Sequence, residues 1–310
     1  MRQRPAIAKL AAALALSSAA LALASARNSP PTPPPQQSQP PSDVEIRDRT
    51  AKVVANQHLD DEAIEQYERL ERHVDQTAGN SPRILDEKTY RVVPTGLGTM
   101  KLLLKDGDKP VDHAEYFKQL QAWKETLEIV LQPGDSRTKA AHAKWQKKTR
   151  DRAELVDAAR DAFSIHWLSR ENFHGRPCDV IQLDPNQNFR PHSLFQEALT
   201  HVNVKIWIDI ESNQIARGEA HVTRDLSFGG GILGKLYRGG VFTLDQTEVA
   251  PGLWFPSRYQ YDYTARKFLF TFEQHQYIEA SRYRLVGTPK QALAMALSEL
   301  AGAKSGFRDP

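Results

Sequence analysis

The longest regular pattern of hydrophobic and polar positions runs from His201 to Val286. At its start, Val202, Val204, Ile206 and Ile208 alternate with mixed polar positions and fall on one face of an extended chain. Alternation with a period of two is typical of a β-strand with one buried face. Clusters of Gly, Pro, Asn and Asp separate further runs of this kind. The pattern therefore predicts antiparallel strands at 201–209, 214–226, 241–249, 253–264, 267–278 and 280–286.

Several of these strands carry bulky apolar groups on one face and mixed residues on the other. Phe242 and Leu244 share a face, and the tyrosines of 253–264 fall together, as do the phenylalanines of 267–278. A strongly curved sheet would gather such groups into one hollow. The alternative is an ordinary packed core, because burial is the usual fate of aromatic residues in strands.

The period changes in the rest of the chain. From Asp43 to about Gln76, apolar residues recur at spacings of three and four, which predicts a helix. Residues 112–131 and 136–162 predict two more helices, the second long and basic, and 291–300 predicts a short last helix. The basic helix fits either an anionic membrane surface or a solvated face. Short strands are predicted at 88–93, 99–105, 164–169 and 177–183, with an irregular loop at 184–200.

The first 42 residues do not look like part of a folded core. Residues 1–26 have a charged start, an apolar run and a small-residue site, which predicts a secretory signal cleaved after Ala26. Residues 27–42 are dominated by proline and glutamine and predict a disordered tether. Residues 43–310 then form one domain with a helical insert at 112–162.

Charge and cysteine content narrow the function. The formal charge of +3 is carried by the predicted signal, so the mature chain is balanced between acids and bases, which argues against nucleic-acid binding. Cys178 is the only cysteine, so an intramolecular disulfide is excluded. A bridge between two copies and a buried inert thiol are the alternatives, and the strand position of Cys178 favours the second.

The candidate motifs for catalysis, nucleotide binding and metal binding are each incomplete. Residues 229–235 match the letters of a dinucleotide or phosphate loop, but a strand follows them, and Leu236 stands where a phosphate loop needs Ser or Thr. Ser136 and Lys139 have a serine-hydrolase spacing, yet Ser136 serves equally well as a helix N-cap. The ten histidines are scattered, so no metal site and no cofactor are predicted. Paired carboxylates can be formed by the fold alone, so a hydrolase of envelope polymers stays an alternative.

Five segments resemble, in order and spacing, the exported bacterial outer-membrane lipoprotein-sorting proteins. They are 173–183 (FHGRPCDVIQL), 205–209 (KIWID), 227–236 (SFGGGILGKL), 254–256 (WFP) and Tyr283-Arg284. These proteins are relatives of the periplasmic lipoprotein carrier and its outer-membrane receptor and have the Lol-type fold. The resemblance covers roughly residues 89–286 and is best from Phe173 onward.

The resemblance implies an α+β fold in which a strongly curved, unclosed antiparallel sheet, a half-barrel, holds helices in its concave face. It implies a non-catalytic carrier in the periplasm of a Gram-negative bacterium, active in outer-membrane biogenesis, that hides acyl chains of lipoproteins or lipids. Its expected lining is Phe242, Leu244, Tyr259, Tyr261, Phe268, Phe270 and Phe272. The alternative is a non-catalytic assembly or signalling protein that docks an envelope partner. The link 228–236 either touches a membrane or partner transiently or folds back as an apolar plug.

Overall fold

The computed structural model describes residues 40–79, 81–132, 134, 136–228 and 234–304. The predicted signal, nearly all of the predicted tether and residues 229–233 of the link lie outside the described residues. The helices are α2 (Asp43–Ala63), the short 3-10 turn η1 (Ile64–Gln66), α3 (His113–Leu131), α4 (Ser136–Ala162), α5 (Leu194–Leu199) and α6 (Pro289–Lys304). Among them, none combines the length and the apolar run that crossing a bilayer requires.

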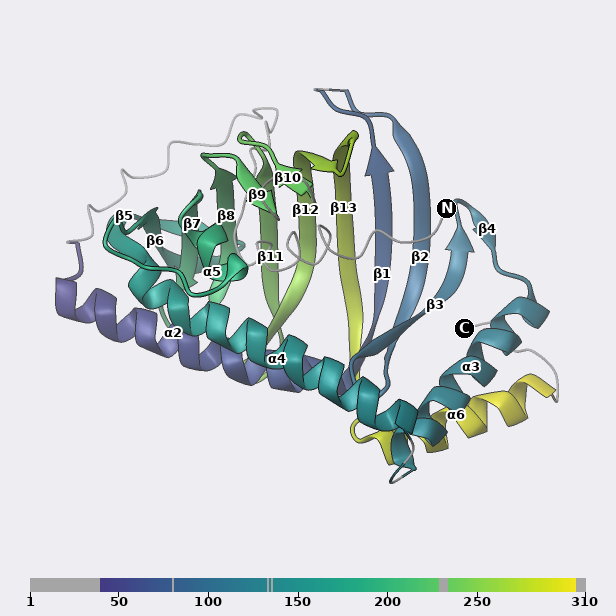
Figure 1. Cartoon of the computed structure of the whole chain (residues 1–310). Coiled ribbons are helices and arrows are strands. Elements are labelled where there is room, and N and C mark those ends of the chain that lie inside the picture. The colour runs from purple at the N-terminus through teal and green to yellow at the C-terminus, as the bar shows by residue number, and fades with distance from the viewer. Residues whose placement is uncertain (1–39, 80, 133, 135, 229–233, 305–310) are drawn as a thin grey trace, which may run out of the picture. The chain divides into compact units, whose positions relative to one another are not determined.

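The strands are β1 (Tyr67–Gln76), β2 (Ile84–Pro94), β3 (Thr99–Asp106), β4 (Lys109–Pro110), β5 (Phe163–Phe173), β6 (Arg176–Pro185), β7 (Val202–Asp209), β8 (Ile215–Val222), β9 (Leu226–Phe228), β10 (Gly234–Leu236), β11 (Val241–Ala250), β12 (Leu253–Lys267) and β13 (Phe270–Leu285). They form one antiparallel sheet in the order β4-β3-β2-β1-β13-β12-β11-β8-β7-β6-β5, with β10 joining β12 to β9 (Figure 1). Within the described residues the sheet is not closed, so the predicted α+β class with an unclosed antiparallel sheet is confirmed.

The chain divides into two compact units, each made of three separate segments. The first unit comprises residues up to 56, then 157–246 and 260–273, and the second comprises 57–156, 247–259 and 274 onward. Both units draw on β12 and β13, because these long strands pass the boundaries at residues 259 and 273.

In the first unit, β7 pairs with β6 and β8, and β8 pairs with β11. The apolar face predicted for β7 is confirmed, since Val202, Val204, Ile206 and Ile208 are all buried. The N-terminal part of α2 is attached to this unit by Arg49, which donates a hydrogen bond to the carbonyl of Ile210 and lies 3.5 Å from a carboxylate oxygen of Asp179.

In the second unit, α3 and α6 lie side by side over β2 and β3 (Figure 1). Trp123 of α3 is fully buried, and its indole N–H donates to the carbonyl of Pro94 at 2.9 Å. Asp112 caps α3 by accepting a hydrogen bond from the amide of Glu115, as a residue before a helix often does. The core of this layer is Val93, Leu102, Leu120, Trp123, Leu127, Val286, Ala292, Ala296 and Leu300.

The helix predicted for 43–76 is wrong in its second half. It ends at Ala63, and residues 67–76 form β1, which pairs with β2 on one side and β13 on the other. Leu70 and Val74 are four residues apart, and this spacing places two side chains on one face of either a helix or a strand. Hydrogen bonding to two strands decides the outcome, because it pairs the backbone along most of the segment.

The strands near the C-terminus and one loop also differ from the prediction. The break predicted at 265–266 is wrong, because β12 continues to Lys267 and the turn lies at 268–269. A single strand, β13, then covers most of the two strands predicted at 267–278 and 280–286, and it pairs with β1 along most of its length. The register shifts near Arg282, whose φ of 53° marks a bulge in β13. The loop predicted at 184–200 contains the short helix α5.

Candidate functional site

Three predicted lining residues of the first unit lie in a cluster of aromatic rings. Phe242 is fully buried and stacks on Tyr263, with 5.5 Å between ring centroids and 22° between planes. Tyr261 meets the edge of Phe242 at 6.2 Å, and Phe272 meets Tyr263 at 6.4 Å. Leu244 is buried beside Phe242 on the same face of β11. Tyr261 and Phe272 are only partly buried, so part of this aromatic cluster remains accessible.

Phe268 and Phe270 do not join these rings. They flank Leu269 in the turn between β12 and β13, and the exposed fractions of the three residues are 53%, 91% and 79%. The structure thus places two of the seven predicted side chains at a hairpin tip, at the surface of the first unit.

Tyr259 belongs to the second unit, where it shares one face of β12 with Phe255, which is part of a row of three aromatic rings. Tyr67 packs edge-on against Phe255 with centroids 4.9 Å apart, and Phe255 contacts Tyr283 at 5.2 Å. The hydroxyl of Tyr283 donates to the carbonyl of Pro256 at 2.6 Å. Burial raises the pKa of Tyr259 to about 12 and also raises the pKa of Tyr283, so both hydroxyls stay protonated. We call Tyr67, Phe255, Tyr259 and Tyr283 the tyrosine face.

A row of charged residues accompanies the tyrosine face on β1. Arg69, Glu71 and His73 alternate along the strand on the same side as Tyr67. The carboxylate of Glu71 is 2.7 Å from both the Arg69 guanidinium and the His73 ring, and 2.8 Å from the ammonium of Lys101. Sequence reasoning missed this row because it assigned the segment to a helix. Reading 67, 69, 71 and 73 with a period of two would have found it.

The electrostatics of this row hold Glu71 ionised. Burial acts to raise the pKa of Glu71, but hydrogen bonding with His73 and the positive charges of Arg69 and Lys101 outweigh burial and lower it well below its usual range. Burial likewise acts to lower the pKa of Arg69, and the carboxylate of Glu71 overcomes this and raises it. A carboxyl group held ionised in this way is unsuited to donate a proton, so Glu71 is a poor general acid.

An ion pair fastens two helices beside the tyrosine face. Arg152 of α4 donates hydrogen bonds to both carboxylate oxygens of Asp61 at the end of α2. The charges of Arg69, Glu71, Arg152 and Asp61 all act on the pKa of Tyr259. The charged row and the ion pair between the helices therefore share the electrostatic surroundings of this hydroxyl.

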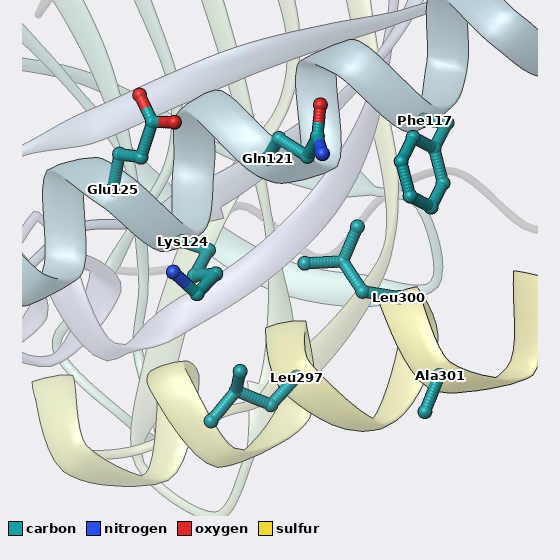
Figure 2. A pocket seen from close by; sticks show the side chains of 7 residues that line it. All are labelled: Phe117, Gln121, Lys124, Glu125, Leu297, Leu300 and Ala301. Carbon is teal, nitrogen blue, oxygen red and sulfur yellow. The ribbon is translucent and has the colours of Figure 1, made fainter. Parts of the chain in front are cut away.

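A separate cleft of about 320 Å³ lies between α3 and α6. Figure 2 shows Leu300 pointing from α6 toward α3. The cleft has apolar walls and a polar rim, in which Lys124 is paired with Glu128 at 2.8 Å. Its lining is Phe117, Gln121, Lys124, Glu125, Leu297, Leu300 and Ala301, and none of the seven predicted residues is among them. The volume is at the lower end of the range for ligand pockets.

Several chemical roles find no support in the part of the chain that the structure describes. No group of three or more His, Cys, Asp or Glu side chains there could hold a metal ion. Cys178 is buried, and burial raises the pKa of its thiol to about 12, so it is a weak nucleophile. Aromatic faces beside charged rows are suited instead to hold an amphiphile, with its chain on the rings and its polar end near the charges.

Comparison with known proteins gives similarities of fold at very low sequence identity. No protein-family model matches the chain, and no curated protein matches it either. Solved structures similar to it include a DUF1329 family protein from Desulfovibrio piger, at 13% identity, covering 77% of this chain and 92% of that one with a TM-score of 0.29.

Two others carry the family description that the motifs resemble. A putative outer membrane lipoprotein-sorting protein domain from Vibrio parahaemolyticus is 9% identical, with 76% of this chain and 92% of that one covered and a TM-score of 0.28. A LolA superfamily protein from Nitrosomonas europaea is 11% identical, with 77% and 96% covered and a TM-score of 0.30. The solved structures similar to this chain thus include members of the lipoprotein-sorting family. These similarities concern the fold alone.

Proposed function

We propose that this protein is a non-catalytic binding protein that holds acyl chains of lipoproteins or lipids against the aromatic side chains of its sheet. We further propose that it is exported to the periplasm after cleavage behind Ala26 and acts there in outer-membrane biogenesis. The charged row at Arg69, Glu71, His73 and Lys101 would then face the polar end of such a ligand.

One observation carries the proposal. Each unit gathers partly buried aromatic side chains on a sheet face, Tyr261 and Phe272 in the first unit and Tyr259 and Tyr283 in the second. Rings that are neither fully packed nor fully exposed can receive an apolar chain at a modest rearrangement cost. Each methylene hidden from water stabilises the complex by about 0.8 kcal/mol. In the second unit, loading at Tyr259 would require the Arg152–Asp61 pair of α4 and α2 to shift.

The test is native mass spectrometry of the mature protein purified gently from the periplasm, followed by solvent extraction and lipid analysis. We expect co-purifying acylated molecules and uptake of a fluorescent fatty-acid probe by the delipidated protein. Tyr261→Lys should weaken uptake at least about tenfold, because a buried ammonium opposes an acyl chain. Leu297→Lys, in the α3–α6 cleft, is the matched control, since Leu297 is 46% exposed and tolerates a charge.

The possible outcomes distinguish the aromatic side chains of the sheet from the α3–α6 cleft. They also distinguish acyl binding from the assembly or signalling function. Loss of uptake in Leu297→Lys alone would move the acyl site to the cleft between α3 and α6. A lipid-free mass together with no probe uptake would overturn acyl binding. It would favour the assembly or signalling protein that docks an envelope partner, which partner capture from the periplasm would then test.

A further inference from the structure

The hairpin tip at Phe268, Leu269 and Phe270 is the most exposed apolar feature of the described residues. Leu269 is 91% exposed and Phe270 79%. Elsewhere in the described ranges, exposed large apolar side chains occur singly or as the pair Ile84 and Leu85. Three consecutive exposed apolar residues lower the solubility of the protein and add no packing. Such a patch indicates a site that another surface covers.

The backbone conformation of this turn does not favour the bulky apolar residues that occupy it. Phe268 and Leu269 form the two-residue connection between β12 and β13, and Phe268 has a φ of 53°. Glycine is the residue usually found where the first position of such a turn has a positive φ, because a Cβ there meets the backbone. A bulky aromatic residue in this conformation is strained. The tip therefore carries large apolar side chains at positions where the turn favours glycine and small polar residues.

Basic residues lie next to the tip on the strands that form the hairpin and on the adjacent strand β10. Arg266 and Lys267 immediately precede Phe268, and β10 places Lys235 opposite Arg266. Lys235 is paired with Asp225 at 2.6 Å, and Glu273 is the acid nearest the tip on β13. From Thr264 to Glu273 the hairpin therefore has two basic residues and one acid. Apolar residues at the end with cations behind them match the layering of acyl chains and anionic headgroups in a bilayer surface.

We propose that this hairpin tip inserts into the surface of an anionic lipid membrane. Leu269 and the two phenylalanines enter the boundary between headgroups and acyl chains, and Arg266 and Lys267 lie at the level of the phosphates. The three tip residues are not members of the aromatic cluster, and the proposal does not depend on the acyl-binding function proposed above.

The test is flotation of the purified mature chain with vesicles of phosphatidylglycerol and phosphatidylethanolamine, compared with vesicles of phosphatidylcholine. We expect binding to the anionic vesicles, weakened by added salt, and much less binding to the neutral ones. The informative variant is Phe268→Gly with Leu269→Asn, which restores the residues that the turn prefers. It should raise the melting temperature slightly and weaken vesicle binding at least about tenfold.

A control and a positive reporter accompany this variant. Leu59→Gln removes an exposed leucine from α2 and should leave vesicle binding unchanged, since Leu59 is 58% exposed and distant in sequence from the tip. Leu269→Trp should keep binding, and its added fluorescence should be quenched by brominated phosphatidylglycerol. Vesicle binding by the Gly-Asn variant that equals wild type, equal binding to neutral vesicles, or no binding at all by the wild type would each overturn the proposal.

Discussion

At the scale of single residues, Glu71 sets the electrostatics of the second unit. Its side chain is 6% exposed and contacts Arg69, His73 and Lys101 at once. Three basic groups around one carboxylate leave an excess of positive charge if that carboxylate is neutralised. Removing one member of a buried ionic network is costly, because the partners remain buried without compensation.

Glu71→Gln is therefore expected to lower the free energy of unfolding at pH 7 by about 2–3 kcal/mol. The folded-state pKa of Glu71 lies below its unfolded value, so its contribution is full above that value and is lost as pH falls through and below about 4. Urea unfolding from pH 7 to pH 3 should show the gap in unfolding free energy between wild type and variant narrowing below about pH 4. Glu87→Gln, whose carboxylate pairs with Arg72 at a more exposed site, should cost less than about 1 kcal/mol. A gap for Glu71→Gln that stays constant down to pH 3 would contradict this account.

Some residues of the candidate site could be placed from the sequence, and others could not. Phe242 and Leu244 could be placed on one face because alternation fixes the direction of a strand side chain. Phe268 and Phe270 were misplaced, since the sequence predicts the turn at residues 265–266, whereas the apolar residues 268–269 form it. The partners of Glu71 come from β1 and from β3, which β2 separates in the sheet, and a single sequence does not give the order of the strands.

At the scale of elements, close approach of β11 to β12 depends on a glycine. A Cβ at Gly240 would lie 3.1 Å from the Cβ of Tyr263 and 3.3 Å from Val222. Tyr263 is the ring on which Phe242 stacks, so the absence of a side chain at Gly240 lets the aromatic cluster of the first unit form.

Gly240→Ala is expected to destabilise the protein by about 1–3 kcal/mol, because overpacking forces the neighbouring side chains to shift. Gly302→Ala is the matched control. Nothing lies within 4 Å of the position of its Cβ, and Gly302 is in α6, so alanine there should stabilise by up to about 1 kcal/mol. Thermal unfolding of both variants measures the difference. Equal melting temperatures for the two would show that Gly240 is not required for packing.

Elements with a strong period were predictable, and those decided by pairing were not. The helices at 112–131 and 136–162 follow from their spacing and match α3 and α4 closely. β1 was missed because its apolar spacing of four fits both structures, and only β2 and β13, which lie next to it in the sheet, determine the outcome.

At the scale of the whole molecule, a bound ligand should stabilise the fold as a whole. If acyl chains bind the native state alone, a fatty acid at about 100 times its dissociation constant adds about 2.7 kcal/mol. For a chain of this size, that corresponds to a rise in melting temperature of roughly 5–10 °C. Differential scanning calorimetry of the delipidated protein with increasing fatty acid checks this, and octanol serves as a short-chain control. An unchanged melting temperature at saturating fatty acid would contradict acyl binding.

The pairing of β1 with β13 has a consequence for how the chain is made. Tyr67 lies opposite Leu285, and Asp75 opposite Gln276, so β1 obtains one of its two neighbours from near the far end of the sequence. Contacts this distant form slowly, and they cannot form until the last strand has been synthesised. A polypeptide whose central strand pairing waits for its C-terminal region stays unfolded for longer. The order of strands would thus delay completion of the sheet until synthesis of the chain is nearly finished, and would leave the unpaired edge of β1 open to aggregation until then.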